Sequence, residues 1–419
     1  MVPAPLTSRF IRVRRESTLR SIYQMGRDMR IIKIILAGLL AVVLLAVIGF
    51  FAFAPAFVEK SRNAVAVHDP YPVSDAARAL HDQLIVGDWH ADPLLWNRDL
   101  SQRGDYGQVD VPRLIEGGVA LQVFTAVTKS PAGQNYDNNS TDAFDNITAL
   151  AVGQLWPFRT WNSLLERALY QAERLHKVEA ALPDTFRIIR TRADLDALLA
   201  DREAGKAVVG GILGIEGAHP LEGEIANLDL IEAAGHRVIG LHHFFDNELG
   251  GSLHGQGNHG LSDFGRAVVA EVAKRGMVLD LAHSSPQVAQ DVLEMTDIPL
   301  VVSHTGVRAH CDVKRNFPDA LMQEIAATGG VIGMGYWDEV ACGDIRPAGI
   351  AKMIVKAVEV VGIDHVSLGS DFDGSVATAF DTSEMPALTQ ALMDAGLTET
   401  QIRKVMGENM LRVLRARLN

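Results

Sequence analysis

Cysteine is nearly absent from this sequence, which contains only Cys311 and Cys342 in 419 residues. Neither cysteine stands where a metal ligand is expected. The pair has two interpretations. The first is two buried thiols, which are common in protein cores. The second is one disulfide, which requires an oxidising compartment. The amino terminus indicates which compartment applies.

Acidic residues outnumber basic residues outside the amino terminus. The net charge of the chain is -12. Residues 1–60 hold nine Lys and Arg against three Asp and Glu, so the rest carries a net charge of -18. An acidic body argues against a nucleic acid as its partner. Aromatic residues are also few, at 6%, whereas 37 glycines suit many short turns. The 48% hydrophobic content is that of a globular protein with a sizeable core.

One long apolar run stands near the amino terminus. Residues 1–33 form a basic leader, and residues 34–53 contain no charged side chain, which is enough to cross a bilayer as a helix. A secretory signal peptide is the competing interpretation, but its apolar region is usually shorter, about 7–15 residues. We expect an uncleaved transmembrane anchor with the leader in the cytoplasm. Residues 54–74 would then be a linker, and residues 75–419 the main domain on the extracytoplasmic side.

Eight short apolar runs recur through the main domain, most of them ending in a polar residue and followed by an amphipathic stretch. Near-continuous apolar runs are typical of strands buried on both faces, as in parallel sheets. Eight such units predict an α/β fold, a (β/α)8 TIM-type barrel, with a doubly wound open sheet as the alternative. The expected strands are Leu84–His90, Val119–Ala126, Val208–Glu216, Val238–His243, Met277–His283, Leu300–His304, Val331–Tyr336 and Val366–Asp371.

Helices are expected between these strands, and one insertion interrupts the alternation. Residues 128–206 contain no convincing strand and include a long helical stretch, roughly Thr141–Ala181. This helical insertion is a candidate wall of the functional site and a candidate surface for a homodimer. The other expected helices are Ala76–Asp82, Pro112–Glu116, Asp229–Ala234, Asp263–Arg275, Pro286–Met295, Pro318–Ala327 and Ala348–Val361.

Polar residues close most of the expected strands. In this type of barrel the carboxyl ends of the strands meet at one mouth, where the chemistry takes place. A single histidine after a strand is usually a hydrogen-bonded structural residue, but several at equivalent positions, with carboxylates at others, indicate a metal centre. The residues concerned are His90, Asp92, Glu216, His242, His243, His283, His304 and Asp371.

Five of these residues form a ligand set for two ions. The terminal ligands would be His90, Asp92, His283 and His304, and Glu216 can bridge. Two divalent ions that share a carboxylate and a hydroxide lower the pKa of the water and polarise a carbonyl. Imidazole and carboxylate ligands suit Zn²⁺, with Mn²⁺, Co²⁺ and Fe²⁺ as alternatives. We therefore expect two Zn²⁺ ions as cofactors.

At these residues the sequence resembles the membrane dipeptidase (renal dipeptidase) family, peptidase family M19, within the amidohydrolase group of barrels. The resemblance covers about residues 75–415, and the order and spacing of the shared stretches make it specific. These stretches are Asp88–Asp92, Gln108–Leu114, Glu116–Val119, Gly214–Gly217, Arg237–His243, Gly260–Gly265, Asp280–Ser285, Ser303–His304, Arg315–Asn316, Pro318–Asp319 and Gly369–Gly374.

The resemblance implies how the ligands are divided between two metals. His90 and Asp92 would bind one ion, and His283 and His304 would bind the other. Glu216 would bridge the two ions. The number of ligands alone predicts two ions, and the resemblance adds which residues bind each of them.

The resemblance also implies roles for residues around the metals. His243 would lie over the substrate carbonyl and stabilise the developing oxyanion. Arg315 would bind the terminal carboxylate of the substrate, for which a guanidinium fork is suited. Asp371 would orient the water or carry its proton to the leaving amine. Cys311 and Cys342 fall where family members carry a disulfide, which supports pairing them.

The activity expected from this site is that of a membrane-anchored binuclear zinc dipeptidase. A metal-bridged hydroxide would attack the peptide carbonyl, with His243, Asp371 and Glu216 as the catalytic residues. Dipeptides are the expected substrates, since a free amino group and a free carboxylate would both be recognised. The alternative is a related amidohydrolase acting on N-acyl amino acids, lactones or β-lactams. A catalytically silent binding protein is disfavoured by the complete ligand set.

Overall fold

The structure is a computed structural model that describes the backbone of residues 7–419 and the side chains from residue 14 onward. The chain divides into two compact units, residues 1–54 and residues 55–419. Helix α1 (Thr7–Arg62) contains an apolar span long enough to cross a membrane, which could be a membrane anchor or a signal sequence. The first six residues of the expected leader lie outside the described residues. The helix also continues through Arg62, into residues that were expected to form a linker.

The second unit is built on a closed ring of eight parallel strands, which confirms the predicted (β/α)8 barrel. The order around the ring is β1-β2-β4-β5-β6-β7-β8-β9. The ring is closed by the pairing of β9 with β1, and β2 pairs with β4 along seven residue pairs, from Leu121↔Gly210 to Val127↔Glu216. The ring strands are β1 (Val86–Ala91), β2 (Val119–Val127), β4 (Val209–Glu216), β5 (His236–Gly240), β6 (Val278–Asp280), β7 (Val301–Thr305), β8 (Val331–Met334) and β9 (Val366–Leu368).

A ninth strand, β3 (Phe186–Ile188), lies within the insertion, where no strand was expected. It pairs with the beginning of β4, from Phe186↔Val209 to Ile188↔Gly211, whereas β5 pairs with β4 further along. The strand is therefore an addition beside the ring and not one of its eight members. Three residues with an arginine in the middle are too short to give a recognisable strand pattern.

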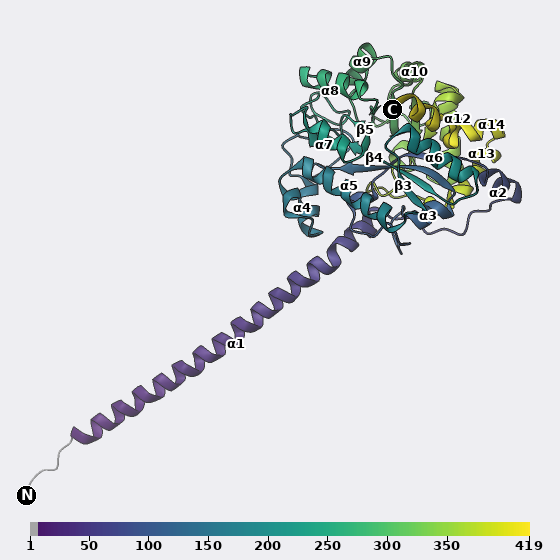
Figure 1. Cartoon of the computed structure of the whole chain (residues 1–419). Helices are drawn as coiled ribbons and strands as arrows, with labels where there is room; N and C mark the ends of the chain where they lie inside the picture. Colours follow the sequence, from purple (N-terminus) through teal and green to yellow (C-terminus); the bar gives the residue numbers. More distant parts are fainter. Residues whose placement is uncertain (1–6) are drawn as a thin grey trace, which may run out of the picture. The chain divides into compact units, whose positions relative to one another are not determined.

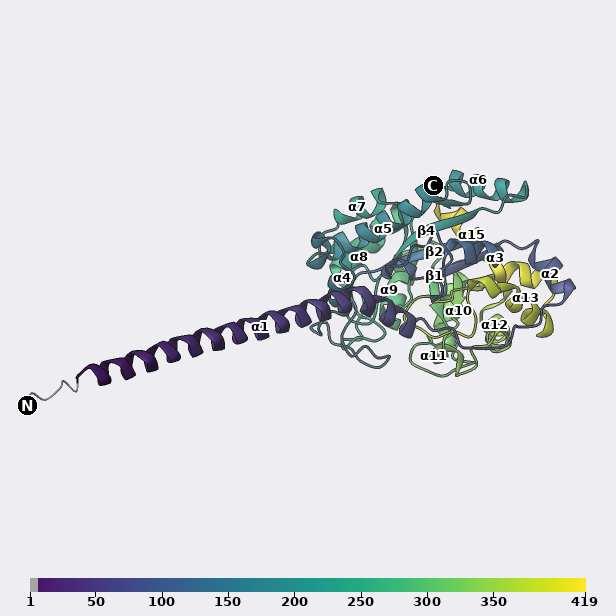
Figure 2. The ribbon, with the colours of Figure 1, turned by 90° about the horizontal axis from the view of Figure 1, so that it is seen from below.

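Helices surround the ring of strands, as Figure 1 and Figure 2 show from two directions. They are α2 (Asp75–His81), α3 (Val111–Glu116), α4 (Asn146–Gly153), α5 (Leu164–Ala181), α6 (Arg192–Glu203), α7 (Asn227–Ala233), α8 (Asp263–Lys274), α9 (Pro286–Met295), α10 (Asp319–Ala327), α11 (Asp338–Ala341), α12 (Pro347–Val361), α13 (Met385–Asp394), α14 (Glu399–Arg403) and α15 (Asn409–Arg417). The shorter turns are η1 (Pro93–Leu95), η2 (Phe158–Trp161), η3 (His219–Leu221), η4 (Ile363–His365), η5 (Thr382–Glu384) and η6 (Lys404–Glu408).

The long helical stretch expected in the insertion is broken into α4, η2 and α5. Helix α4 ends at Gly153. Two residues later, Leu155 adopts a left-handed backbone conformation with φ of 56°, which does not continue a helix. Pro157 follows and has no N–H to donate to a helix. A new helix begins after Ser163, whose side chain accepts a hydrogen bond from Glu166 N–H. This is a typical N-cap arrangement.

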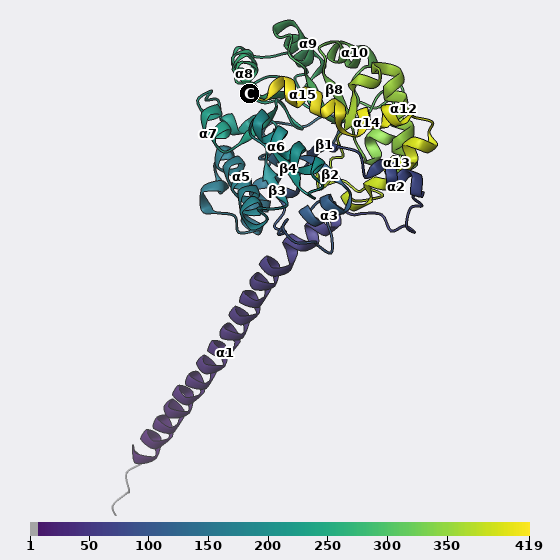
Figure 3. The same ribbon diagram turned by 45° about the vertical axis from the view of Figure 1, so that its right-hand side comes forward.

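Helix α15 closes the amino-terminal end of the barrel. The first residues of β6, β7 and β8 are Val278, Val301 and Val331, and all three belong to one buried cluster with Met410 and Leu414 of α15. Figure 3 shows α15 beside β8. Because this end is filled by apolar side chains, polar groups can gather only at the opposite, carboxyl end of the strands.

Candidate metal centre

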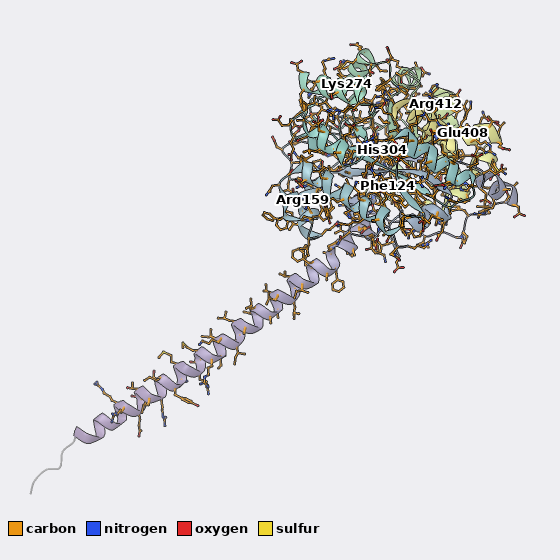
Figure 4. The ribbon with its side chains drawn as sticks, viewed as in Figure 1. Phe124, Arg159, Lys274, His304, Glu408 and Arg412 are labelled. Atoms are coloured by element: carbon orange, nitrogen blue, oxygen red, sulfur yellow. A yellow bond between two sulfur atoms is a disulfide. The ribbon has the colours of Figure 1, made fainter. Side chains whose placement is uncertain are left out.

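The five expected metal ligands all lie at the carboxyl end of the barrel. His90 belongs to β1 and Asp92 follows this strand directly, while Glu216 is the last residue of β4. His304 lies in β7, and His283 follows β6 by three residues. All five are buried, and Figure 4 labels His304 within the outline of the second unit. The structure therefore brings together residues that are more than 200 positions apart in the sequence.

The carboxylate of Glu216 stands at the centre of this group. Its Oε1 atom lies 3.5 Å from His90 Nε2, 3.1 Å from His283 Nε2 and 3.3 Å from His304 Nε2. Its Oε2 atom lies 3.2 Å from His243 Nε2. One carboxylate thus faces four imidazoles through both of its oxygens, an arrangement in which it can contact more than one ion.

Metal donors converge in three overlapping groups at this mouth. Within each group the donor atoms lie within 4.8 Å of one another, and every member is buried. The groups are His90 with Glu216 and His304, Glu216 with His243 and His283, and His90 with Asp92 and Asp371. A set of this size offers more donors than one four-coordinate ion would use.

The hydrogen bonds behind His304 fit the binding of a cation. Ser303 Oγ donates to Asp280 Oδ2 over 2.6 Å, so it can only accept from His304 Nδ1, which lies 2.9 Å away. The proton of His304 is then on Nδ1, and Nε2 presents a lone pair toward Glu216 Oε1 and His283 Nε2, the latter 2.9 Å away. A lone pair that faces a carboxylate is unfavourable unless a proton or a cation lies between them.

The electrostatics of the site also favour positive charge. Burial raises the pKa of Glu216 well above its usual range and that of Asp371 to about 8. Burial lowers the pKa of His283 and His304, which keeps both imidazoles neutral, the form that binds a metal. Burial also acts to lower the pKa of His90, but the adjoining carboxylates outweigh it and raise the value to about 10. A divalent cation would replace these protons.

Asp92 and Asp371 approach His90 from two neighbouring strands. Asp92 Oδ2 lies 3.5 Å from His90 Nε2, and its other oxygen accepts a hydrogen bond from Thr125 Oγ1. Asp371 Oδ1 lies 3.9 Å from the same nitrogen. The backbone N–H of Asp371 donates to His90 O over 3.1 Å, and its φ of 61° is left-handed. Asp371 is therefore held beside β1 by the backbone.

The two consecutive histidines after β5 are turned to different neighbours. His243 Nε2 faces Glu216, and its Nδ1 lies 3.3 Å from Lys129 O. Burial lowers the pKa of His243 to about 4. His242 Nδ1 instead contacts Ser284 Oγ at 3.1 Å. Only His243 of this pair is placed at the mouth.

Arg315 lies beside the metal ligands with part of its guanidinium unpaired. The residue is 1% exposed, and Nη2 donates to His304 O over 2.6 Å. Its Nε finds no hydrogen-bond partner among residues 14–419. The guanidinium carbon lies 5.4 Å from the ring centroid of Trp337, whose Nε1 donates to Tyr136 Oη over 2.9 Å. A buried guanidinium with a free donor is suited to an anionic group of a ligand.

The pocket over the metal ligands is lined by several residues that the sequence analysis did not single out. Tyr136, Phe244 and Trp337 line it together with His243 and Arg315. Trp337 follows β8 closely and could have been found by inspecting the end of that strand. Tyr136 belongs to the insertion and carries no sequence signal. Apolar side chains also contribute, namely Leu95, Val127 and Ile147.

Cys311 and Cys342 form a disulfide. Cys311 precedes Arg315 in the connection between β7 and α10, and Cys342 directly follows α11. Trp337 stands immediately before α11. The disulfide therefore ties together the two segments that carry Arg315 and the aromatic ring beneath it.

The closed barrel and its buried cluster of histidines and carboxylates define a metal-dependent hydrolase of the TIM-barrel class. The chain belongs to the membrane dipeptidase family (peptidase family M19), whose family model matches residues 74–418. It is accordingly a metallo-dipeptidase by family, and this family implies a divalent metal. The family expected from the sequence motifs is thereby confirmed.

Relatives with known names or structures agree with this family. The chain is 28% identical to dipeptidase aclJ of Aspergillus oryzae over 351 residues, covering 78% of this chain and 76% of that one. It is 27% identical to dipeptidase tcpJ of Claviceps purpurea over 323 residues, covering 74% and 69%. The crystal structure of dipeptidase AC, an M19 metallopeptidase, is 26% identical and superposes with a TM-score of 0.65, covering 80% of this chain and 99% of that one. A metallopeptidase of Rhodobacter sphaeroides, liganded with a phosphinate mimic of L-Ala-D-Ala, is 25% identical with a TM-score of 0.64 and the same coverage.

Proposed function

We propose that this protein is a membrane-anchored dipeptidase that works with two zinc ions. The observation that carries the proposal is the position of Glu216, whose carboxylate lies within 3.5 Å of His90, His283 and His304. A carboxylate so placed can bridge two ions. The dipeptidase names of the relatives, and the dipeptide mimic bound by the Rhodobacter sphaeroides metallopeptidase, support dipeptides as the substrate class.

The two ions would share Glu216 as a common ligand. His90 and Asp92 would hold one ion, and His283 and His304 the other. When bound, such a pair supplies a water of lowered pKa and a Lewis acid for the substrate carbonyl. Neutral imidazoles and carboxylates suit Zn²⁺, with Mn²⁺, Co²⁺ and Fe²⁺ as alternatives.

His243 would stabilise the negative charge that develops on the carbonyl oxygen of the substrate. Its Nε2 faces the metal ligands, and its Nδ1 stays close to Lys129 O. A proton on Nε2 would donate a hydrogen bond to the oxygen as it becomes negative. Such a donor, aimed at an oxygen where negative charge develops, acts most strongly in a buried site that water does not reach.

Asp371 would act at the scissile bond of the dipeptide, and Arg315 at its carboxyl end. Asp371 lies beside His90, where it can take a proton from the attacking water and pass it to the leaving amine. Arg315 would bind the free carboxylate of the second residue through its guanidinium, whose Nε is unpaired. A site that needs this carboxylate would disfavour longer peptides, whose next residue occupies that position.

The apolar span of α1 would anchor the enzyme in a membrane. The span is long enough to cross a bilayer, and the residues before it are basic. Positively charged flanks normally stay in the cytoplasm, so the barrel would lie on the extracytoplasmic side. An oxidising compartment there would agree with the disulfide between Cys311 and Cys342.

A substrate panel on the full-length protein tests this proposal. Zinc content and hydrolysis are measured on the same sample with free dipeptides, N-acetylated dipeptides, dipeptide amides, lactones and β-lactams. We expect two equivalents of zinc, rapid turnover of the free dipeptides, slow turnover of the dipeptide amides, and no turnover of the other classes. If free dipeptides are untouched while another class is hydrolysed, the protein is a related amidohydrolase and the dipeptidase proposal is wrong.

A bridging-ligand variant tests the two-metal arrangement separately. Glu216→Gln keeps the size of the side chain but removes its charge, so one ion should be lost together with nearly all turnover. The matched control is Glu222→Gln, since Glu222 is exposed on the loop that follows the same strand. Near-normal activity of Glu216→Gln would contradict the two-metal arrangement.

A further inference from the structure

The residues just before the barrel contact a loop at the mouth of the site. We refer to residues 55–66 as the N-terminal strap. They comprise the end of α1 and the four residues after it, and they belong to the second unit of the chain. The match to the family model begins only at residue 74. The strap is thus an addition of this chain to the matched region.

The strap is hydrogen-bonded to the loop that follows β9. We refer to residues 369–381, between β9 and η5, as the β9 loop. Asn63 Oδ1 accepts a hydrogen bond from Ser375 N–H over 2.9 Å. Ala66 N–H donates to Thr378 O over 2.7 Å, and Thr378 N–H donates to Ala64 O over 3.0 Å. These three bonds join segments about 310 residues apart and fix the backbone of the loop at two places.

A buried ion pair provides a second link between the strap and the β9 loop. Arg98 donates from Nε to Glu59 and from Nη2 to Asp373. Asp373 also accepts from Gln108 N–H over 2.8 Å and from Val109 N–H over 3.0 Å. Glu59 is only 2% exposed. The strap therefore supplies one of the carboxylates that pair with Arg98 beside the loop.

The β9 loop needs such support because of its backbone conformation. Asp371, Asp373 and Ser375 have φ of 61°, 61° and 65°, so three alternate non-glycine residues are left-handed. This region is sparsely populated by non-glycine residues, and it persists where surrounding contacts over-determine it. The same loop carries Asp371, and its residues Gly374 and Val376 line the pocket. A loop held less firmly would move both the carboxylate and the wall of the site.

We propose that the N-terminal strap is a positioning element of the active site, in which Asn63 and Glu59 hold the β9 loop so that Asp371 stays beside His90. This inference rests on the proposed function, because Asp371 is taken as the proton carrier. Asn63 and Glu59 are positioning residues and do not touch the substrate. The strap, and not the apolar span before it, makes the contacts with the β9 loop. Removing the span alone should therefore leave the site intact. Removing the strap as well should impair it.

Point variants of the full-length, zinc-loaded protein test the proposal. Asn63→Ala leaves Ser375 N–H without its acceptor, and Glu59→Ala removes one partner of Arg98. Glu59→Gln retains an oxygen that can accept from Arg98. Lys60→Ala is the matched control, because Lys60 is exposed on the same turn of α1. The measurements are kcat and KM for a free dipeptide, zinc content, and hydrogen exchange of the amides in residues 374–378.

The expected result is a loss of turnover without a loss of substrate binding. Asn63→Ala and Glu59→Ala should each lower kcat about tenfold, the scale of one buried hydrogen bond lost, with KM nearly unchanged. Zinc content should stay as in the wild type, and amides 374–378 should exchange faster. Glu59→Gln and Lys60→Ala should behave as the wild type. Wild-type exchange and kcat in both alanine variants would overturn the proposal.

The two proposals can fail independently. If the wild-type protein hydrolyses no dipeptide, the proposed function is wrong, but exchange of amides 374–378 still decides whether the strap holds the loop. If the wild type is active and the alanine variants match it in kcat and exchange, only the role of the strap is wrong. If Asn63→Ala does not fold, Glu59→Ala and its glutamine counterpart still decide the outcome.

Discussion

Ser303 Oγ lies 2.9 Å from His304 Nδ1 and orients the imidazole of this ligand. The hydroxyl of Ser303 donates its hydrogen to Asp280 Oδ2, so Ser303 Oγ accepts a hydrogen bond from the Nδ1–H of His304. His304 Nε2 is thereby left free to bind a metal. Partners of this kind fix the tautomer and the direction of a histidine ligand, and their loss typically weakens metal binding by about 10–100-fold.

Replacing Ser303 by alanine should therefore weaken zinc binding without unfolding the barrel. We expect the zinc affinity of Ser303→Ala to fall by about tenfold or more, measured by competition with a chromophoric chelator. Ser367→Ala is the matched control, since Ser367 is a buried serine of β9 whose hydroxyl has no partner among residues 14–419. Equal zinc affinities of the two variants would show that the Ser303 hydroxyl does not orient His304.

Replacing Arg315 should raise KM mainly for substrates with a free carboxylate. A lost charge-assisted hydrogen bond costs about 1.5–3 kcal/mol, so kcat/KM of Arg315→Met for a dipeptide should fall by about 10–100-fold. The same variant should differ little from the wild type on the matching dipeptide amide, which lacks the anion. Steady-state kinetics on both substrates provide the test. A similar loss on the amide would mean that Arg315 acts on the fold and not on the carboxylate.

The barrel could be predicted because its strands are buried on both faces. Such strands appear in the sequence as continuous apolar runs, and each of the eight expected runs overlaps a strand of the ring. The strand β3 could not be predicted, since Phe186–Ile188 shows neither a run nor an alternation and depends on pairing with β4. Similarly, the break between α4 and α5 depends on the conformation of Leu155, a residue with no intrinsic preference for a left-handed backbone.

The same distinction separates the residues of the candidate site that could be predicted from the sequence from those that could not. His90, Glu216 and His304 could be selected from the sequence because parallel strands bring their carboxyl ends to one mouth. Tyr136 reaches the pocket from the insertion, whose position depends on packing between distant segments. Asn63 is hydrogen-bonded to a residue of the β9 loop that lies 312 positions away in the sequence. No local sequence pattern predicts such a contact. Side chains placed by strand topology were therefore predictable, and side chains placed by tertiary contacts were not.

Loss of the disulfide should reduce both the stability and the substrate affinity of the enzyme. Cys311 and Cys342 are 31 residues apart in sequence, and closing a loop of this size typically stabilises a protein by about 2–4 kcal/mol. A Cys311→Ser, Cys342→Ser double variant should unfold at lower urea concentration and show a higher KM, because Arg315 and Trp337 are no longer tied. Reducing agent should shift the wild type toward the variant and leave the variant unchanged. Coincident urea curves for the oxidised wild type and the variant would argue against a stabilising disulfide.

His236, at the start of β5 and far along the strand from the metal ligands, should make stability depend on pH. The residue is fully buried, and its Nδ1–H donates to Gly214 O over 3.1 Å. Burial lowers the pKa of His236 to about 4, although the bond to Gly214 opposes this shift. The folded state thus keeps the imidazole neutral at a pH where the unfolded chain already binds a proton.

The sign of the effect follows from this difference in proton binding. Above pH 6.5 both states are neutral at His236, and its contribution is fully present. As the pH falls from about 6.5 to about 4, only the unfolded state gains the proton, so the free energy of unfolding should decrease by about 3 kcal/mol. His236→Asn retains a donor toward Gly214 O but does not titrate, so its urea midpoint should change less over this range. Measurements should use zinc-saturated protein at each pH, with metal content checked, so that loss of the ions is not mistaken for the histidine effect. Parallel pH profiles for the two proteins would show that His236 does not titrate with the expected shift.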